Sequence, residues 1–222
     1  MLLHADNLTV ERGSRAVISH LSFNVRAGEA LLVVGPNGAG KTTLIRTLAG
    51  FIAPSAGSIT LKGDTADRDR SDGDIADLCH YVGHLTGVKA ALTAAENLLF
   101  WARYLGADGG EFLRERVEAA LARFGLLSLA DFPAGLLSAG QKRRLGLARL
   151  TVASRPIWLL DEPTVSLDAT STDLLAALIE EHLRARGIVI AATHLPLGLE
   201  QPVYLRLGPQ AAGDTLIGEA GL

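Results

Sequence analysis

The sequence predicts an α/β fold in which helices cover a parallel sheet. Two short apolar runs, Ile157–Asp161 and Ile188–Thr193, are typical of buried strands, and the segment between them, Ala169–Arg186, has helical character. A third apolar run, Glu29–Val34, precedes a helix expected over Lys41–Ala49. Strands that alternate with helices in this way pair in parallel and carry the helices on their faces.

Short strands are predicted on both sides of the first helix. Leu2–Val10 and Ala16–Val25 are strand candidates around a turn at Arg12–Ser14. The helix itself should stop at Gly50, and Ser58–Leu61 is the next strand candidate.

The middle of the chain is predicted to be helical. Thr93 and Glu96 form a T-x-x-E capping box that opens a helix through about Leu105. The polar segment Lys62–Asp77 is expected to be a surface loop, because its acidic residues do not have the spacing of a calcium-binding loop. A second helix, ended by Gly125, carries apolar residues at helical spacing that we expect in the core: Phe112, Leu113, Val117, Ala120, Leu121 and Phe124.

Composition limits the class of protein. The chain has 222 residues, 48% hydrophobic and 20% charged, which is typical of one globular domain. Its net charge of −3 lacks the positive excess that nucleic acid attracts, so we expect no nucleic-acid partner. The single cysteine, Cys79, excludes a disulfide within the chain.

No membrane span is predicted. The best apolar runs, Ala30–Val34 and Ile157–Leu160, are far shorter than the roughly 20 residues that a span needs. Met1–Val10 also lacks a basic start followed by an apolar run, as a secretory signal would have. We therefore expect a chain that is soluble by itself, and any membrane role requires a partner that supplies the spans.

The strongest functional signal is a phosphate-binding loop. Gly35–Thr42 has the sequence GPNGAGKT, which fits G-x-x-x-x-G-K-[ST] between an apolar strand and a helix. Glycines let the backbone wrap around phosphates, and a helix N-terminus adds positive potential. Lys41 should reach the β- and γ-phosphates, and Thr42 should ligate Mg²⁺.

Two acids end the strand Ile157–Asp161. Ligands bind at the carboxyl ends of parallel strands, so Asp161 is expected to hold Mg²⁺ and Glu162 to act as general base towards water. A strand that simply exits into solvent with acidic residues is the alternative. The phosphate loop upstream favours the nucleotide site.

A second candidate anion site is Leu137–Gln141, with the sequence LSAGQ, before a helix expected from about Lys142 to Ala153. A serine hydroxyl, a glycine N–H and a helix N-terminus can together bind a γ-phosphate. Ala139 keeps its backbone N–H group available, so we expect the anion site to function with alanine at this position. By itself, the motif is also compatible with an ordinary helix start.

Together these motifs resemble those of ABC (ATP-binding cassette) transporter nucleotide-binding domains over about residues 2–206. The phosphate loop, the signature segment Leu137–Gln141, the acidic strand, the Ser166–Asp168 loop and His194 follow the family's order. The family's signature is LSGGQ, so Ala139 replaces a glycine here. The resemblance implies a RecA-like P-loop NTPase core over 1–84 and 153–222, an N-terminal antiparallel β region, and a helical subdomain over about 85–152.

The resemblance also implies a site shared by two copies of the chain. ATP, with Mg²⁺, would lie between Lys41 of one subunit and Ser138 of the other in a head-to-tail dimer, with Asp168 across the interface. His194 would contact the γ-phosphate and act beside Glu162 and Lys41. The implied nucleotide contacts are Gly35, Pro36, Asn37, Gly38, Ala39, Gly40, Lys41, Thr42, Thr43, Ser138, Gly140 and Gln141, and the metal ligands are Thr42 and Asp161.

Two positions depart from the family. A glutamine usually follows the strand near Tyr81–Gly83, and here the sequence continues His84-Leu85, with Leu85 in the glutamine's place. An aromatic ring usually stacks on adenine from the first β-turn. Arg12 stands near that turn and is either a guanidinium that stacks on the base or a solvated turn residue.

The finer resemblance is to the haem-exporting ATP-binding subunits of the bacterial cytochrome c maturation system. It is carried by residues 81–98, 137–150 and 187–199. It implies a peripheral position on the cytoplasmic side of the inner membrane, bound to a multi-span subunit, and ATP-driven haem delivery to a periplasmic chaperone. An exporter with a drug or lipid cargo is the alternative. His80 and His84 lie near a predicted strand, which favours a structural role over haem binding.

Overall fold

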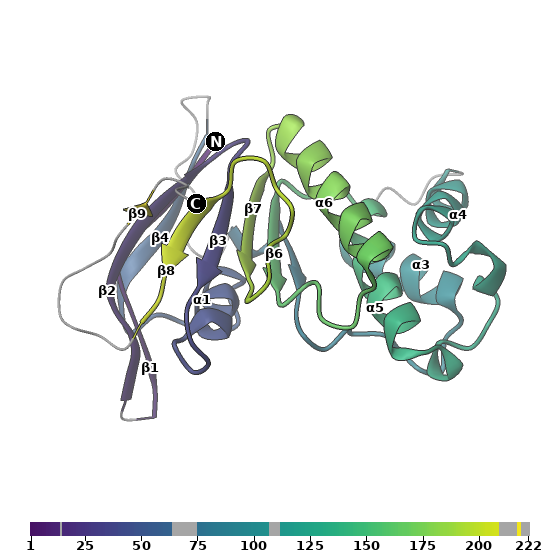
Figure 1. Ribbon diagram of the computed structural model, residues 1–222, viewed down its shortest axis with the longest axis horizontal. Helices are drawn as coiled ribbons and strands as arrows, with labels where there is room; N and C mark the ends of the chain where they lie inside the picture. Colours follow the sequence, from purple (N-terminus) through teal and green to yellow (C-terminus); the bar gives the residue numbers. More distant parts are fainter. Residues whose placement is uncertain (14, 64–74, 107–111, 209–216, 219–222) are drawn as a thin grey trace.

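The computed structural model describes residues 1–13, 15–63, 75–106, 112–208 and 217–218. Figure 1 shows three regions in a row: an antiparallel sheet at the left, a second sheet in the middle and a group of helices at the right. The α/β fold with an antiparallel β region and a helical region is confirmed.

The antiparallel sheet has the strand order β2-β1-β4. Its members are β1 (Leu2–Arg12), β2 (Arg15–Arg26) and β4 (Ala56–Lys62). Both pairs are antiparallel, and Arg12 faces Arg15 across the predicted turn. Strand β1 begins at the predicted Leu2 and ends two residues late, and β2 and β4 extend one or two residues beyond the prediction at both ends.

The central sheet has the strand order β5-β6-β7-β3-β8-β9. All pairs from β5 to β8 are parallel, and β9 is antiparallel to β8. The strands are β3 (Ala30–Val34), β5 (Cys79–Val82), β6 (Ile157–Asp161), β7 (Ile188–Ala192), β8 (Val203–Arg206) and β9 (Ile217–Gly218). The predicted buried parallel strands are therefore confirmed.

The helices follow the sequence pattern with shifted ends. They are α1 (Lys41–Leu48), α3 (Ala94–Tyr104), α4 (Leu113–Arg123), α5 (Ala139–Ala148) and α6 (Ala169–Arg184). Short 3-10 turns lie at Leu127–Leu129, Ala134–Leu136 and Arg149–Thr151. Among the described residues, no helix combines the length and apolar character that crossing a bilayer requires.

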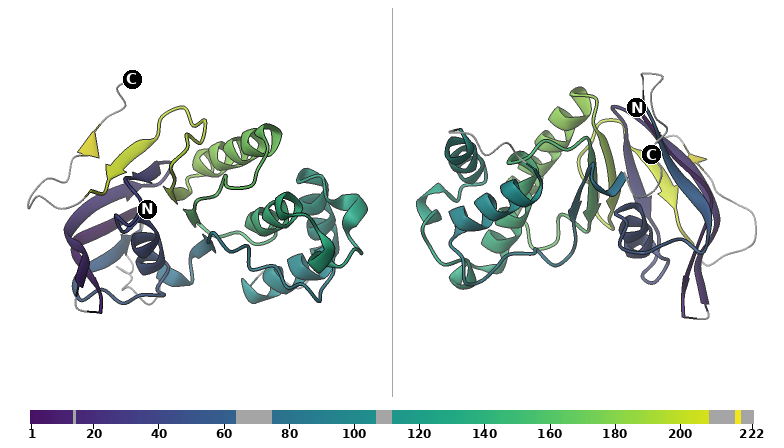
Figure 2. Two further views of the ribbon diagram at one scale, coloured as in Figure 1. Left: turned by 60° about the horizontal axis from the view of Figure 1, so that its bottom comes forward. Right: turned by 180° about the vertical axis from the view of Figure 1, so that it is seen from behind.

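Two hydrophobic cores lie on opposite faces of the central sheet, because successive strand residues point to opposite faces. Leu31 and Val33 of β3 join α1 and the antiparallel sheet in one core. Leu32 of the same strand joins α6 and the helical region in the other. Figure 2 shows the helical region to one side of the two sheets in both views.

Local capping explains two helix starts. The Thr93–Glu96 capping box is present with both of its hydrogen bonds. Helix α5 begins at Ala139, earlier than the predicted Lys142, because Ser138 and Gln141 form a second capping box. This helix ends at Ala148 and continues only as a 3-10 turn.

Two other expectations were wrong in detail. Helix α6 ends at Arg184, two residues before the predicted Arg186, and Arg186 itself has a positive φ of 66°. The glycine that follows packs closely: a Cβ on Gly187 would lie 2.2 Å from Nε2 of His182. Phe112 precedes α4 and is 68% exposed, so it does not belong to the core stripe.

The predicted surface loop over 62–77 lies mostly outside the described residues, which omit 64–74. Ile75, at its end, is only 1% exposed and packs in the core beneath α1 and β4. This part of the prediction was therefore wrong, since an apolar residue here closes the core.

Candidate nucleotide-binding site

The phosphate loop connects β3 to α1 and leaves the start of that helix open. Gly40 is the N-cap of α1 with φ 99°, a left-handed conformation that L side chains rarely adopt, and no side chain caps the helix. A Cβ on Gly35, whose φ is 147°, would lie 2.0 Å from the carbonyl oxygen of Leu207. The glycines therefore allow a close backbone path that leaves amides available to an anion.

The ammonium of Lys41 lies inside this loop. Its Nζ donates to the carbonyl oxygens of Gly35 (2.7 Å) and Pro36 (3.1 Å), and the residue is buried. The loop carbonyls thus hold the positive charge next to the free amides. Thr43, the last predicted contact, is also buried, and its carbonyl accepts a bond from Thr47.

The two predicted metal ligands are brought together from distant parts of the chain. The hydroxyl of Thr42 donates to Oδ1 of Asp161 at 3.0 Å. Asp161 is buried, and its Oδ2 has no hydrogen-bond partner among the described residues. A buried, unpartnered carboxylate oxygen beside a hydroxyl is an oxygen donor set that suits Mg²⁺.

Glu162 and His194 meet at the same sheet edge, because they follow the neighbouring strands β6 and β7. The Nε2 of His194 lies 3.3 Å from Oε1 of Glu162. Glu162 has φ 49°, and its N–H donates to the carbonyl of Ala192 at 2.8 Å. A non-glycine residue in this conformation costs about 1–3 kcal/mol and is typical of functional sites.

The signature residues lie elsewhere. Helix α5 packs in the core on the opposite face of the sheet from α1 and stands well to the right of it in Figure 1. Ser138 is exposed at its start, and Gly140 approaches the Ser166 carbonyl. The structure therefore brings together the phosphate loop, Asp161, Glu162 and His194, and keeps Ser138–Gln141 apart from the loop in the same copy.

Arg15 is a residue beside the phosphate loop that the sequence analysis did not single out. A cavity of about 620 Å³ beside the phosphate loop is lined by Arg15, Val17, Asn37 and others. Arg12 lines a different cavity with Tyr81 and other residues. The signal was present in the sequence, since two arginines flank the turn, but only the pairing of β1 with β2 decides which one lies at the loop.

His80 has a structural role. It is buried in β5, and its Nε2 donates to the carbonyl of Ala153 at 2.8 Å. Burial lowers the pKa of His80 to about 4, so the ring is neutral at pH 7. His84, by contrast, is exposed beyond the strand end.

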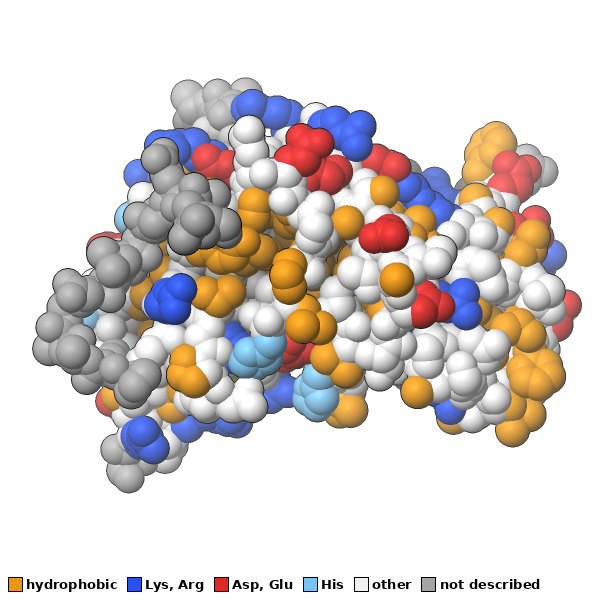
Figure 3. All heavy atoms as spheres, in the orientation of Figure 1, with side chains coloured by type: hydrophobic (Ala, Val, Ile, Leu, Met, Phe, Trp, Pro, Cys, Tyr) orange, Lys and Arg blue, Asp and Glu red, His pale blue; other side chains and the backbone are white. Residues whose placement is uncertain are grey.

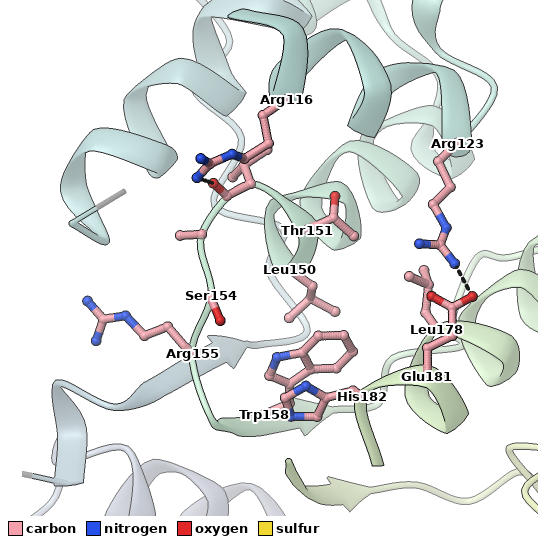
Figure 4. A pocket seen from close by; sticks show the side chains of 12 residues that line it. Arg116, Arg123, Leu150, Thr151, Ser154, Arg155, Trp158, Leu178, Glu181 and His182 are labelled. Carbon is pink, nitrogen blue, oxygen red and sulfur yellow. Dashed lines mark hydrogen bonds and ion pairs between the residues drawn. The ribbon is translucent and has the colours of Figure 1, made fainter. Parts of the chain in front are cut away.

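A third cavity, of about 500 Å³, lies between α4 and α6 and away from the phosphate loop. Figure 4 shows the Arg123–Glu181 ion pair (2.6 Å) at its edge and the stacked rings of Trp158 and His182 at its floor. None of the predicted nucleotide contacts lines this cavity.

Comparison with known proteins places this geometry in a family. Residues 18–165 match the ABC transporter family. The chain is 47% identical over 220 residues to the cytochrome c biogenesis ATP-binding export protein CcmA of Roseobacter denitrificans, covering 99% of this chain and 97% of that protein. It is 46% identical over 200 residues to CcmA of Brucella abortus, covering 90% and 88%.

A solved structure agrees with these sequence matches. A dimeric, post-hydrolysis structure of the ATP-binding cassette MJ0796, bound to ADP and Pi, superposes with a TM-score of 0.76 at 25% identity. The match covers 97% of this chain and 99% of that one. On sequence and fold alike, this chain belongs to the ABC transporter family, among its cytochrome c biogenesis ATP-binding export proteins.

Proposed function

We propose that this chain is the ATP-hydrolysing subunit of an ABC transporter complex for cytochrome c biogenesis, and that it couples hydrolysis to haem export and delivery to a periplasmic haem chaperone. The observation that carries the hydrolytic part is the meeting of Thr42 with Asp161 and of Glu162 with His194 at one sheet edge. The cargo rests on similarity to curated export proteins of cytochrome c biogenesis.

Each residue at the edge has a separate task. Amides of residues 35–43 and the Lys41 ammonium hold the phosphates of ATP. Thr42 and Asp161 would hold Mg²⁺, which would neutralise part of the phosphate charge. Glu162 takes the proton of the attacking water, and His194, 3.3 Å away, orients that carboxylate and contacts the γ-phosphate.

Arg15 is the residue that we expect to stack on the adenine. It lines a cavity together with Asn37 and Gly38 of the phosphate loop. A guanidinium is flat and stacks on aromatic rings as an aromatic side chain would. The sequence left two possibilities open for Arg12, stacking on the base or a solvated turn. In this proposal Arg12 is the solvated turn residue.

A second copy completes the site in the proposal. The hydroxyl of Ser138 accepts from the N–H of Gln141, so its own O–H remains free to donate. With Gly140, it would bind the γ-phosphate held by Lys41 of the other copy. Dimerisation together with a membrane partner is typical of the family, and the position of α5 in this chain supports the head-to-tail arrangement.

The membrane partner is proposed to dock in a groove between the core and the helices. A cavity of about 710 Å³ is lined by Phe51, Leu85, Trp101, Tyr104, Arg149 and others. Leu85 is 75% exposed, Tyr104 71% and Phe51 65%. Monomeric proteins rarely expose such apolar groups together unless a partner covers them.

Figure 3 shows one face of the molecule, on which hydrophobic side chains also gather at the right-hand end, over the helices. Docking in the groove would place the chain peripherally on the cytoplasmic side of the inner membrane. Leu85, in place of the family's usual glutamine, would then give this surface an apolar contact instead of a polar one.

The test of the cargo is purification of the chain from membranes under mild detergent, with identification of the multi-span protein that accompanies it. Recovery of a cytochrome c maturation subunit supports the proposal, and recovery of a drug- or lipid-exporter subunit refutes the haem assignment. Leu85→Asp should release the partner and leave ATP binding unchanged.

The test of the mechanism is Glu162→Gln. This variant should bind ATP, accumulate as a dimer and hydrolyse ATP roughly 10²–10⁴-fold more slowly, the range for loss of a general base. Unchanged hydrolysis would refute Glu162 as the base. The matched control is the exposed Glu118→Gln on α4, which should leave turnover unchanged.

A further inference from the structure

One arginine of the signature helix reaches the backbone of the catalytic edge. Arg143 lies in α5, five positions beyond Ser138, and is 3% exposed. Its guanidinium donates to the carbonyl oxygens of Glu162 (2.5 Å), Asp161 (3.4 Å) and Pro163 (3.1 Å). The planar fork of donors therefore binds three consecutive carbonyls of the segment that carries the proposed base.

The same side chain also holds the segment that leads to the proposed docking groove. It donates to the carbonyl of Gly83 at 2.8 Å, directly before His84 and Leu85. Helix α5 packs closely here, since a Cβ on Gly146 would lie 3.2 Å from the Cβ and the carbonyl oxygen of Thr86. Arg143 thus contacts two segments that meet only in the tertiary structure.

This contact has electrostatic as well as geometric consequences. Burial lowers the pKa of Arg143, and the nearby carboxylates of Asp161 and Glu162 raise it. A buried charge that loses its hydrogen-bond partners destabilises the fold. A small movement of α5 therefore either moves the carbonyls with it or breaks these hydrogen bonds. Glu162, with φ 49°, already has a backbone conformation that is costly for a residue other than glycine.

We propose that Arg143 is a positioning residue that sets the backbone of Glu162 according to whether Ser138, at the start of the same helix, is engaged by nucleotide. Arg143 would therefore couple two half-sites of one subunit. One contains Ser138 and faces the partner copy, and the other contains Glu162 and belongs to the subunit's own nucleotide site. The inference rests on the proposed roles of Glu162 and Ser138. Arg143 touches no substrate and acts only through the strand end.

The test compares Arg143→Lys with Arg144→Lys in the full chain co-purified with its membrane partner. Arg144 is the matched control because it follows Arg143 in the same helix, is half-buried, and donates to the backbone carbonyl of Phe124 at 2.9 Å. Lysine keeps the charge but cannot bind several carbonyls in a fork. Arg143→Lys should lower kcat roughly 10–100-fold and change KM for ATP by less than about twofold.

Arg144→Lys should lower kcat by less than about threefold at a similar loss of melting temperature. Equal losses of kcat in the two variants would overturn the proposal, because a merely structural role predicts them. Arg143→Gln is the second variant, should Arg143→Lys fold poorly, and its neutral amide should show the same pattern of kcat against KM.

The coupling itself is tested by combining Arg143→Lys with Ser138→Ala. If Arg143 transmits engagement of Ser138, the second substitution has little further effect once the first is present, and the two losses do not multiply. Multiplicative losses would refute the coupling. Glu162→Gln distinguishes this outcome from failure of the proposed function. If that variant retained hydrolysis, Glu162 would not be the general base, although the contacts of Arg143 with the backbone carbonyls would be unchanged.

Discussion

Two helix N-termini in this chain are built in opposite ways. Helix α1 begins after Gly40, which has no side chain to offer, and no side chain caps its first turn. Helix α5 begins after Ser138, whose hydroxyl and main-chain N–H both bond to Gln141 in a capping box. The start of α1 leaves backbone N–H groups free for a ligand. At the start of α5, side chains of the helix itself accept hydrogen bonds from some of the N–H groups.

The difference explains what each terminus can do. An uncapped terminus has several free N–H groups and binds a phosphate strongly, but it needs the surrounding core to stay folded. Buried Leu44, Ile45 and Leu48 supply that support for α1. A capped terminus is stable when exposed, as α5 is at Ser138, and its remaining hydroxyl proton suits contact with a second copy.

The largest effect on stability and ATP affinity is expected for Gly40→Ala, which alters the uncapped start of α1. A Cβ there would lie 3.0 Å from Cγ1 of Val17 in a backbone with φ 99°, so about 1–3 kcal/mol of stability should be lost. Turning two amides away from the phosphates should cost about 3 kcal/mol of binding, or roughly 100-fold in ATP affinity. Melting curves and nucleotide titration measure the two effects.

The matched control is Gly38→Ala. Its φ of 81° is also left-handed, but an added Cβ meets nothing within 4 Å. It should show the backbone strain without the collision, hence a smaller loss in both measurements. If the two variants were equally impaired, contact with Val17 would not explain the need for Gly40.

The contact between β5 and the segment that follows α5 is expected to weaken in acid. It depends on His80, whose ring donates to the carbonyl of Ala153. Because burial disfavours the charged ring, the folded pKa of about 4 lies below the ordinary histidine value of 6.5. Its stability contribution is therefore full above pH 6.5 and is lost as the pH falls towards 4, by an amount of order 3 kcal/mol.

The measurement is the free energy of unfolding against pH, compared with His80→Gln. Glutamine can keep a donor to Ala153 but does not titrate, so the variant should have a shallower slope over this window. Identical slopes in the two proteins would show that another group causes the acid sensitivity.

Substitutions of Ser138 separate the cap from the phosphate contact. Ser138→Asp keeps a good N-cap, so stability should change by less than about 0.5 kcal/mol, while a carboxylate opposite the γ-phosphate should slow turnover roughly 10–100-fold. Ser138→Ala removes both roles and should also cost about 1 kcal/mol of stability. Normal turnover in Ser138→Asp would exclude this hydroxyl from the site.

The smallest effect is expected for Ala139→Gly, which restores the family's usual residue. Ala139 is the first residue of α5, and its N–H is present with either side chain. Turnover should stay within about twofold, and stability should fall by about 0.5–1 kcal/mol because glycine is the poorer helix former. A larger change in turnover would show that the methyl group of Ala139 shapes the site.

The elements predicted best are those decided by short-range chemistry. The Thr93–Glu96 capping box and the glycines around Lys41 act over a few residues, so their pattern was readable in the chain. Buried parallel strands such as Ile157–Asp161 were also readable, because continuous apolar runs leave few alternatives. Phe112 and Arg186 were misplaced, since neither burial nor a left-handed backbone is specified by hydrophobic spacing.

The sequence by itself determined the phosphate loop, the acidic strand end and the order of motifs, because each depends on neighbouring residues. Only the tertiary structure decided that Arg15 rather than Arg12 lines the loop, and that Arg143 holds the carbonyls of Glu162 and Gly83. Those carbonyls lie 19 and 60 residues from Arg143 along the chain. Contacts at such separations depend on how helices and strands pack, and no local pattern records them.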